Sequence, residues 1–371
     1  MPENGLVRDV FNLQLIEEMG RQLQAVYSDF LFKDFIKAAS NFIPEDSFKF
    51  RNETICNALI EFLPKNYPQG VNIITQTLKP AKNERTFQNF FFMPYASYVE
   101  KLGCKKEYLT ISFNTLKEIT KRFTSEFAIR TFLINFETET LTVLKKWISD
   151  ENHHVRRLVS EGSRPRLPWA QALPKFKIDP TPTLQLLELL KNDDSKYVQK
   201  SVANHLNDIT KDNPKLVLSM LARWKKENNP NTNWIIKHAI RNELKKGTPA
   251  ALHILGYSTN LKLEVNNFQL STNKIEIGGE INFQFNITNL GSKTEPIMID
   301  YICHFMKANG KTAPKTFKLK TAAIQQGESI YFSKKQSFKL ISTRKLYSGE
   351  HKIEIFINGK PYDSKAFILN A

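Results

Sequence analysis

The fold of this chain is decided by the stretch Ile281-Asn282-Phe283-Gln284-Phe285-Asn286-Ile287, in which apolar and polar residues alternate without a break. Such alternation is typical of a β-strand with one buried face, because successive side chains of a strand point to opposite sides. The stretch Leu261-Lys262-Leu263-Glu264-Val265 has the same period, and turn residues occur at Gly278-Gly279, Asn309-Gly310 and Asn358-Gly359. The C-terminal part is therefore predicted to be a β-sheet domain.

Upstream of Gly256-Tyr257 the apolar residues recur at intervals of three and four. Three groups show this spacing: Leu186, Leu187, Leu189 and Leu190; Val198, Val202 and Leu206; and Leu216, Val217, Met220 and Leu221. It is typical of amphipathic helices packed against one another. We therefore expect a multidomain α and β protein, with an all-α domain at residues 1–257 followed by an all-β domain at residues 258–371.

A weak repeat appears in the helical part when the basic residues Arg130, Arg157, Lys200 and Lys237 are aligned. Their irregular intervals bracket the helix-pair repeats of HEAT and armadillo type, which stack into a solenoid with a concave binding face. Cations that recur along such a face suit a phosphate backbone. The alternative is a set of solvated cations on outer helix faces. We expect a HEAT-like repeat solenoid.

The C-terminal domain is predicted to be an immunoglobulin-like β-sandwich, with no disulfide between its sheets. Its expected strands are Lys262–Val265, Lys274–Ile277, Ile281–Asn286, Ile297–Cys303, Thr316–Lys320, Ser329–Phe332, His351–Ile357 and Ala366–Leu369. A basic edge formed by Lys334, Lys335, Lys339, Arg344 and Lys345 suggests phosphate contacts. A purely structural role is the alternative.

Composition narrows the class of protein. No run of about 18 uncharged apolar residues predicts a membrane span, and residues 1–5 do not resemble the start of a secretory signal. Cys56, Cys104 and Cys303 are far apart and match no metal-ligand spacing. We therefore expect a reduced, cytoplasmic protein that needs neither a metal nor another cofactor and does not contact membranes.

Net charge points to a polyanionic partner. The 371 residues include 53 lysines and arginines against 37 acids, a formal net charge of +16. The excess is present on both sides of residue 258. Such a balance favours nucleic acid, although solubility could account for a smaller excess.

The most unusual segment runs from His153 to Trp169, where a basic helix ends in a carboxylate and turns through prolines onto a tryptophan. Glu161 stands directly before Gly162, a residue type that often closes a helix, so its charge is expected to face the negative end of the helix dipole. Four arginines flank it: Arg156, Arg157, Arg164 and Arg166. A carboxylate and an aromatic ring in a cationic pocket suit DNA that carries a damaged base.

The helical part resembles the AlkC branch of the AlkC/AlkD superfamily of bacterial alkylpurine DNA glycosylases, some of which carry a C-terminal immunoglobulin-like domain. The resemblance covers about residues 10–257. It rests on Phe90-Phe91-Phe92-Met93-Pro94-Tyr95 with Tyr98-Val99-Glu100-Lys101-Leu102-Gly103, on residues 155–169, and on residues 201–212. It implies DNA alkylation repair by hydrolysis of the N-glycosidic bond of cationic bases, with 3-methyladenine and 3-methylcytosine as the substrates.

The chemistry suits the carboxylates of the segment. A base with a fixed positive charge is a good leaving group, so the positive charge that develops on the sugar is what needs stabilising. We expect Glu161 to supply that stabilisation and Trp169 to pack on the lesion or sugar. Asp208 and Glu126 are further catalytic candidates. Their alternatives are a local cap before Pro214 for Asp208 and a stabilising first-turn acid for Glu126.

The expected contacts to duplex DNA are Arg130, Arg157, Arg164, Arg166, Lys200 and Lys237. His153, His154 and His205 lack an acid or cysteine that would complete a metal site, so no metal is expected. The aromatic run at residues 90–93 suits a helix core better than a wedge against DNA, which leaves Tyr95 and Tyr98 as candidates for a DNA-facing surface.

The sequence therefore predicts a monofunctional, monomeric glycosylase that acts on double-stranded DNA containing alkylated bases. A non-catalytic HEAT-type scaffold that binds nucleic acid is the alternative, and it predicts salt-sensitive binding without base release. A protein–protein adaptor is a third possibility, and it requires an apolar binding face in place of a basic one.

Overall fold

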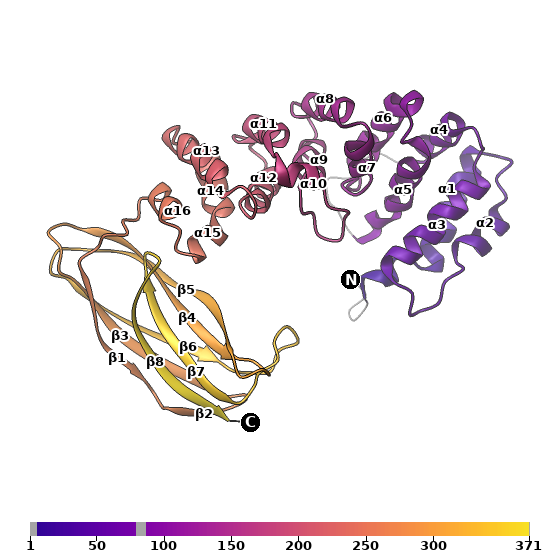
Figure 1. Cartoon of the computed structure of the whole chain (residues 1–371). Coiled ribbons are helices and arrows are strands. Elements are labelled where there is room, and N and C mark those ends of the chain that lie inside the picture. The colour runs from indigo at the N-terminus through magenta and orange to yellow at the C-terminus, as the bar shows by residue number, and fades with distance from the viewer. Residues whose placement is uncertain (1–5, 79–86, 371) are drawn as a thin grey trace. The chain divides into compact units, whose positions relative to one another are not determined.

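The computed structural model describes residues 6–78 and 87–370 (Figure 1). For residues 87 and 88 it describes the backbone alone. The chain forms two compact units. The first contains the described residues up to Pro214 together with Asn228–Ala239, and the second contains Lys215–Glu227 together with the chain from Ile240 onward.

The first unit is helical. Its α-helices are α1 (Leu13–Val26), α2 (Phe32–Ala39), α3 (Phe48–Phe62), α4 (Tyr67–Thr77), α5 (Met93–Gly103), α6 (Leu109–Thr120), α7 (Ala128–Asn135), α8 (Glu137–Trp147), α9 (His153–Gly162), α10 (Pro174–Ile178), α11 (Thr181–Leu190), α12 (Lys196–Ile209) and α14 (Pro230–Ala239). Short 3₁₀ turns occupy Val7–Val10, Phe87–Phe92 and Lys106–Tyr108. The second unit begins with α13 (Pro214–Lys226), α15 (Arg241–Lys245) and α16 (Pro249–Ile254).

Capping residues set the starts of several helices. Asn12, Ser47, Asn66 and Asn152 each accept a hydrogen bond from a backbone N–H of the first turn that follows. Side-chain oxygens at this position satisfy donors that have no partner inside the helix. The starts of these four helices are thus encoded locally.

The repeat that the sequence suggested corresponds to stacked helices. Arg130 lies on α7, Arg157 on α9, Lys200 on α12 and Lys237 on α14. Helix α12 packs against both α9 and α14, and its apolar stripe, Val198, Val202 and Leu206, is fully buried. Each of these helices buries its apolar stripe against its neighbours, as expected for helical repeats.

The rest of the second unit is a β-sandwich. Its strands are β1 (Leu263–Leu270), β2 (Lys274–Glu276), β3 (Glu280–Asn289), β4 (Glu295–Met306), β5 (Thr312–Ile324), β6 (Ser329–Ser337), β7 (Gly349–Ile357) and β8 (Lys360–Asn370). One sheet has the order β1-β3-β6 and the other β2-β8-β7-β4-β5. Neighbouring strands are antiparallel except for the β2–β8 pair.

The apolar side chains of the alternating stretch around residue 281 fill part of the core of the sandwich. Ile281, Phe283, Phe285 and Ile287 on β3 are buried, with exposed or half-buried polar residues between them. Asn358 and Gly359 form the tight β7–β8 turn with φ angles of 45° and 76°, as the turn residues predict. The change from helix to strand falls between α16 and β1, close to the predicted boundary at 257/258, whereas the compact second unit begins earlier in the chain.

All three cysteines are free thiols. Burial raises the pKa of Cys56 and of Cys303 to about 12, so both are unreactive side chains of the core. Within the described ranges, no helix has the length and apolar character needed to cross a membrane.

Candidate active site

Helix α9 carries Glu161 at its C-terminal end. Asn152 caps the start of the helix, and Val155, Leu158 and Val159 are fully buried on its inner face. Gly162 is the last helical residue and does not adopt a left-handed conformation. It is needed for space, because a Cβ at Gly162 would lie 2.5 Å from Cγ2 of Ile129 on α7. The glycine is thus required because α7 packs closely against α9, and not because it ends the helix in a left-handed conformation.

Five charged side chains, two of them on α9, form a row of alternating sign: Glu126, Arg157, Glu161, Arg164 and Asp208. Arg157 pairs with Oε2 of Glu126, and its Nη2 lies 3.3 Å from Oε1 of Glu161. Arg164 places Nη1 2.7 Å from Oε1 of Glu161 and Nη2 2.8 Å from Oδ2 of Asp208. The structure thus brings together the three carboxylates that the sequence singled out.

Glu161 lies at the centre of this row and is only 6% exposed. Burial raises its pKa, but Arg157, Arg164 and the hydroxyl of Ser201 together outweigh burial and bring the pKa below its ordinary value of 4.5. The carboxylate is therefore ionised at neutral pH. It offers fixed negative charge in a place where solvent screens little.

Ser201 is a site residue that sequence reasoning missed. Its Oγ donates a hydrogen bond of 2.6 Å to Oε2 of Glu161. It lies two turns before Asp208 on α12, so both side chains lie on the same face of that helix. That spacing is the signal that could have identified it.

Arg157 contacts four side chains. Besides its two carboxylates, it donates to Oγ1 of Thr124 at 3.0 Å, and its guanidinium lies 4.9 Å from the ring centre of Tyr197. Neither Thr124 nor Tyr197 was predicted. A guanidinium fixed in this way holds Glu126 and Glu161 at a set separation.

Trp169 lies on the loop that follows α9, named here the Trp169 loop (residues 163–173). Its side chain is 86% exposed and its backbone has φ of 65°. The loop is ordered on itself, because the N–H of Leu173 donates to the carbonyl of Pro165 and Leu167 and Leu173 are buried. A large aromatic residue in a strained conformation and open to solvent is typical of a binding site.

Arg130 does not make the phosphate contact that was predicted for it. The side chain is 1% exposed and donates to the carbonyl oxygens of Gly162, Arg164 and Gln171. Burial, and to a lesser extent Arg164, lower its pKa to about 10, which leaves it protonated at neutral pH. The phosphate prediction for Arg130 is wrong because the guanidinium is buried under the Trp169 loop.

The other predicted DNA contacts fall into two groups. Arg157 and Arg164 are largely buried and pair with carboxylates. Their geometry therefore fixes the positions of the acids and does not make the phosphate contacts that were predicted. Arg166 is partly exposed and pairs with Asp212 at 2.7 Å. Lys200 and Lys237 are exposed on α12 and α14, and neither forms an ion pair with another described residue.

Tyr95 and Tyr98 are not on a DNA-facing surface. Both are buried in α5, with exposures of 0% and 1%. Tyr98 stacks on Tyr67, and a Cβ at Gly70 would come within 2.2 Å of its hydroxyl. The candidate role for these two tyrosines is therefore wrong, because the run from Phe91 onward packs into the helical core.

His205 supports the end of α9. Its Nδ1 lies 2.9 Å from the carbonyl oxygen of Ser160, so this nitrogen carries the proton. Burial, followed by the nearby charge of Arg164, lowers its pKa to about 3. The imidazole is therefore neutral. No three His, Cys, Asp or Glu side chains of the described residues gather in a way that could hold a metal ion.

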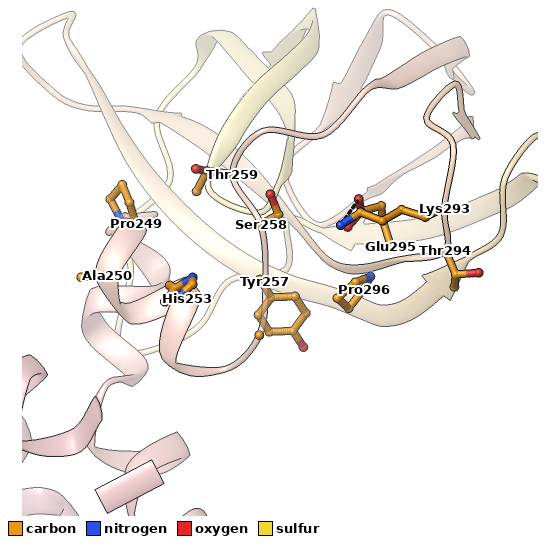
Figure 2. A pocket seen from close by; sticks show the side chains of 11 residues that line it. Pro249, Ala250, His253, Tyr257, Ser258, Thr259, Lys293, Thr294, Glu295 and Pro296 are labelled. Carbon is orange, nitrogen blue, oxygen red and sulfur yellow. Dashed lines mark ion pairs between the residues drawn. The ribbon is translucent and has the colours of Figure 1, made fainter. Parts of the chain in front are cut away.

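A pocket of about 660 Å³ lies in the second unit, between α16 and the segment that leads into β4 (Figure 2). His253 of α16, Tyr257 and Ser258 line it, and Lys293 pairs with Glu295 at its rim across 3.6 Å. No predicted site residue contributes to its lining. The chemistry expected from the sequence is thus centred on α9 and not on this pocket.

Two family descriptions match parts of the chain. Residues 123–242 match the family "DNA alkylation repair enzyme", and residues 264–371 match the C-terminal Ig-like domain of the uncharacterised protein YhaZ. The first range contains the whole row of charged residues from Glu126 to Asp208.

Two relatives resemble nearly the whole chain. The curated Bacillus subtilis (strain 168) protein "Uncharacterized protein YhaZ" is 36% identical over 364 residues, which is 97% of this chain and 98% of that protein. The structure of Pseudomonas fluorescens alkylpurine DNA glycosylase AlkC bound to DNA containing an abasic site analog is 35% identical, with a TM-score of 0.91 over 99% of this chain and 100% of that chain. The predicted resemblance and the order of a helical part and an immunoglobulin-like domain are confirmed. The chain belongs to the DNA alkylation repair enzyme family and carries the C-terminal Ig-like domain of YhaZ.

Proposed function

We propose that this protein is a monofunctional, metal-free DNA glycosylase that releases cationic alkylated bases, with 3-methyladenine and 3-methylcytosine as substrates, from duplex DNA. The observation that supports this most strongly is the buried, ionised Glu161 held between Arg157 and Arg164, next to the loop that exposes Trp169. The likeness to the alkylpurine DNA glycosylase AlkC supports the same reaction class.

The reaction needs little proton transfer to the base. The bond between C1′ and the base nitrogen breaks with its electron pair moving to the base, which neutralises the positive charge of the alkylated ring. Positive charge then develops on the sugar, and water adds to C1′ and loses a proton to solvent. Glu161 and Asp208 stabilise the charged sugar electrostatically. The low pKa of Glu161 suits a stabilising anion better than a general base.

The proposed DNA contacts come from exposed or partly exposed groups. Lys200, Lys237 and Arg166 contact phosphates, and Trp169 packs on the lesion or its sugar. The partner is double-stranded DNA bound by a monomer in the cytoplasm.

Release of free base from methylated duplex DNA in chelating buffer tests the proposal. Release at a rate that does not depend on added metal supports it. Salt-sensitive binding of the same duplex without release of any base would instead support a non-catalytic nucleic-acid scaffold.

A further inference from the structure

The Trp169 loop is anchored at both ends by one buried side chain. Before Trp169, Nη1 of Arg130 donates to the carbonyl of Gly162 at 2.9 Å and to that of Arg164 at 2.7 Å. After Trp169, Nε of Arg130 donates to the carbonyl of Gln171 at 2.6 Å. One guanidinium on α7 therefore links the part of the loop before Trp169 to the part after it.

The anchor points matter because of the residues beside them. Gly162 follows Glu161 directly, and Arg164 is the residue that bridges Glu161 and Asp208. Gln171 lies two residues beyond Trp169. The same guanidinium thus fixes the backbone next to the central carboxylate and next to the exposed ring.

The conformation of Trp169 needs such an anchor. A φ of 65° is unfavourable for a residue with a side chain. The ring itself is 86% exposed, so it gains little from burial. Contacts elsewhere in the loop must therefore keep the tryptophan in place. Gly162 allows this, since its missing Cβ lets Ile129, the neighbour of Arg130, come close to α9.

We infer that Arg130 is a positioning residue, which clasps the Trp169 loop and holds the tryptophan ring at a fixed place relative to Glu161. The inference rests on the proposed glycosylase function. Arg130 acts through Trp169 and touches no part of the substrate. Its loss removes none of the five charged side chains of the row, but it allows the Trp169 ring to move relative to Glu161. Small displacements of positioning groups are costly in rate.

The chain offers a matched control. Arg51 is also a buried arginine, 5% exposed, that clasps carbonyl oxygens, those of Arg8, Phe11 and Pro44. These residues lie in the N-terminal part of the chain, in the first 3₁₀ turn, just before α1 and in the turn before α3, and none of them is a candidate site residue. Replacing Arg51 therefore removes the same kind of clasp without touching the Trp169 loop.

The test is a double-mutant cycle on the single-turnover rate of base release at saturating enzyme. R130M is expected to slow release by about tenfold or more, with R130K partly restoring the rate, while R51M changes it by less than about twofold. In a W169A background, R130M is expected to have less than about a twofold further effect. Equal slowing by R130M in both backgrounds, or no slowing at all, overturns the inference.

Hydrogen exchange supplies a readout that needs no activity. The N–H groups of Ala170 and Leu173 donate to Leu167 and Pro165 inside the loop. They are expected to exchange faster in R130M and R130K and at the wild-type rate in R51M. Unchanged exchange in both Arg130 variants contradicts the clasp. If the intact protein releases no base, the glycosylase proposal fails, while exchange still decides whether Arg130 holds the loop.

Discussion

Nε of Arg164 donates a hydrogen bond of 2.8 Å to Oδ2 of Asp208, across 44 residues of sequence. Asp208 is 3% exposed and Arg164 8% exposed, so this ion pair is buried. It ties α12 to the Trp169 loop and excludes a role for Asp208 as a merely local cap. Breaking this buried pair is costly, because Arg164 then loses one of the two carboxylates that balance its charge.

The D208N variant is therefore expected to lose both stability and activity. The amide cannot balance the charge of Arg164, and the free energy of unfolding should fall by about 2 kcal/mol in urea titrations. D212N is the control, because the Arg166–Asp212 pair is partly exposed and its loss should cost less than about 1 kcal/mol. Equal stabilities of the two variants contradict a buried role for Asp208.

Replacing Trp169 should separate stability from activity. W169G removes an exposed ring and relieves a positive φ, so the protein should be as stable as the wild type or more stable by about 1 kcal/mol. Base release should fall by about tenfold, since contacts of an aromatic ring with a cation contribute about 0.5–2 kcal/mol. N228G, which also relieves a positive φ of 52°, should leave the release rate unchanged. An unchanged rate in W169G rules out a contact with the lesion or sugar.

A pair of glycines in the second unit makes a stability prediction. A Cβ at Gly359 would lie 2.5 Å from Cα of Gly247, and both residues have positive φ. G359A should therefore destabilise by about 1–3 kcal/mol through steric overlap, in addition to about 1 kcal/mol of backbone strain. G310A has the strain alone, because φ at Gly310 is 73° and nothing lies within 4 Å of the added methyl. Equal midpoints of the two variants in urea would disprove the close contact.

His205 should make the protein sensitive to acid. Its pKa is about 3 in the folded state against 6.5 for the free side chain. The unfolded chain therefore binds a proton first as the pH falls. The stability that the neutral imidazole contributes is complete above pH 6.5 and is lost between pH 6.5 and about 3.

The measurement is the free energy of unfolding against pH for the wild type and for H205N, which keeps a donor for the carbonyl of Ser160. The wild-type slope in this window should exceed that of H205N by up to about 1.4 kcal/mol per pH unit, the value for one proton. Parallel curves would mean that His205 titrates normally.

Much of the fold follows from periodicity. The alternation of Ile281, Phe283 and Phe285 predicts a strand that the structure contains as β3, and Asn358-Gly359 predicts the β7–β8 turn. Local patterns succeed here because the alternation of side chains along a strand and the positive φ of a tight turn are set by residues close in sequence.

The site was predictable in its residues but not in its contacts. The chemistry of the charged sugar brought out Glu161, and the family resemblance favoured Asp208 and Glu126, yet sequence spacing does not show which cation each of them meets. Arg130 looks like any repeated basic residue until its burial under the Trp169 loop is known. Tertiary packing, which no local pattern records, decides between a phosphate contact and a clasp.

The most direct test of the account compares base release from methylated duplex DNA by the wild type, E161Q and E243Q. Glu243 is a suitable control, because it is 4% exposed and is also bound by a cation, Lys246, and a hydroxyl, Thr248. E161Q should bind DNA and lose about a hundredfold or more in rate, as for other single electrostatic contacts, whereas E243Q should release base as the wild type does. Release by E161Q at the wild-type rate would contradict the claim that this carboxylate stabilises the charged sugar.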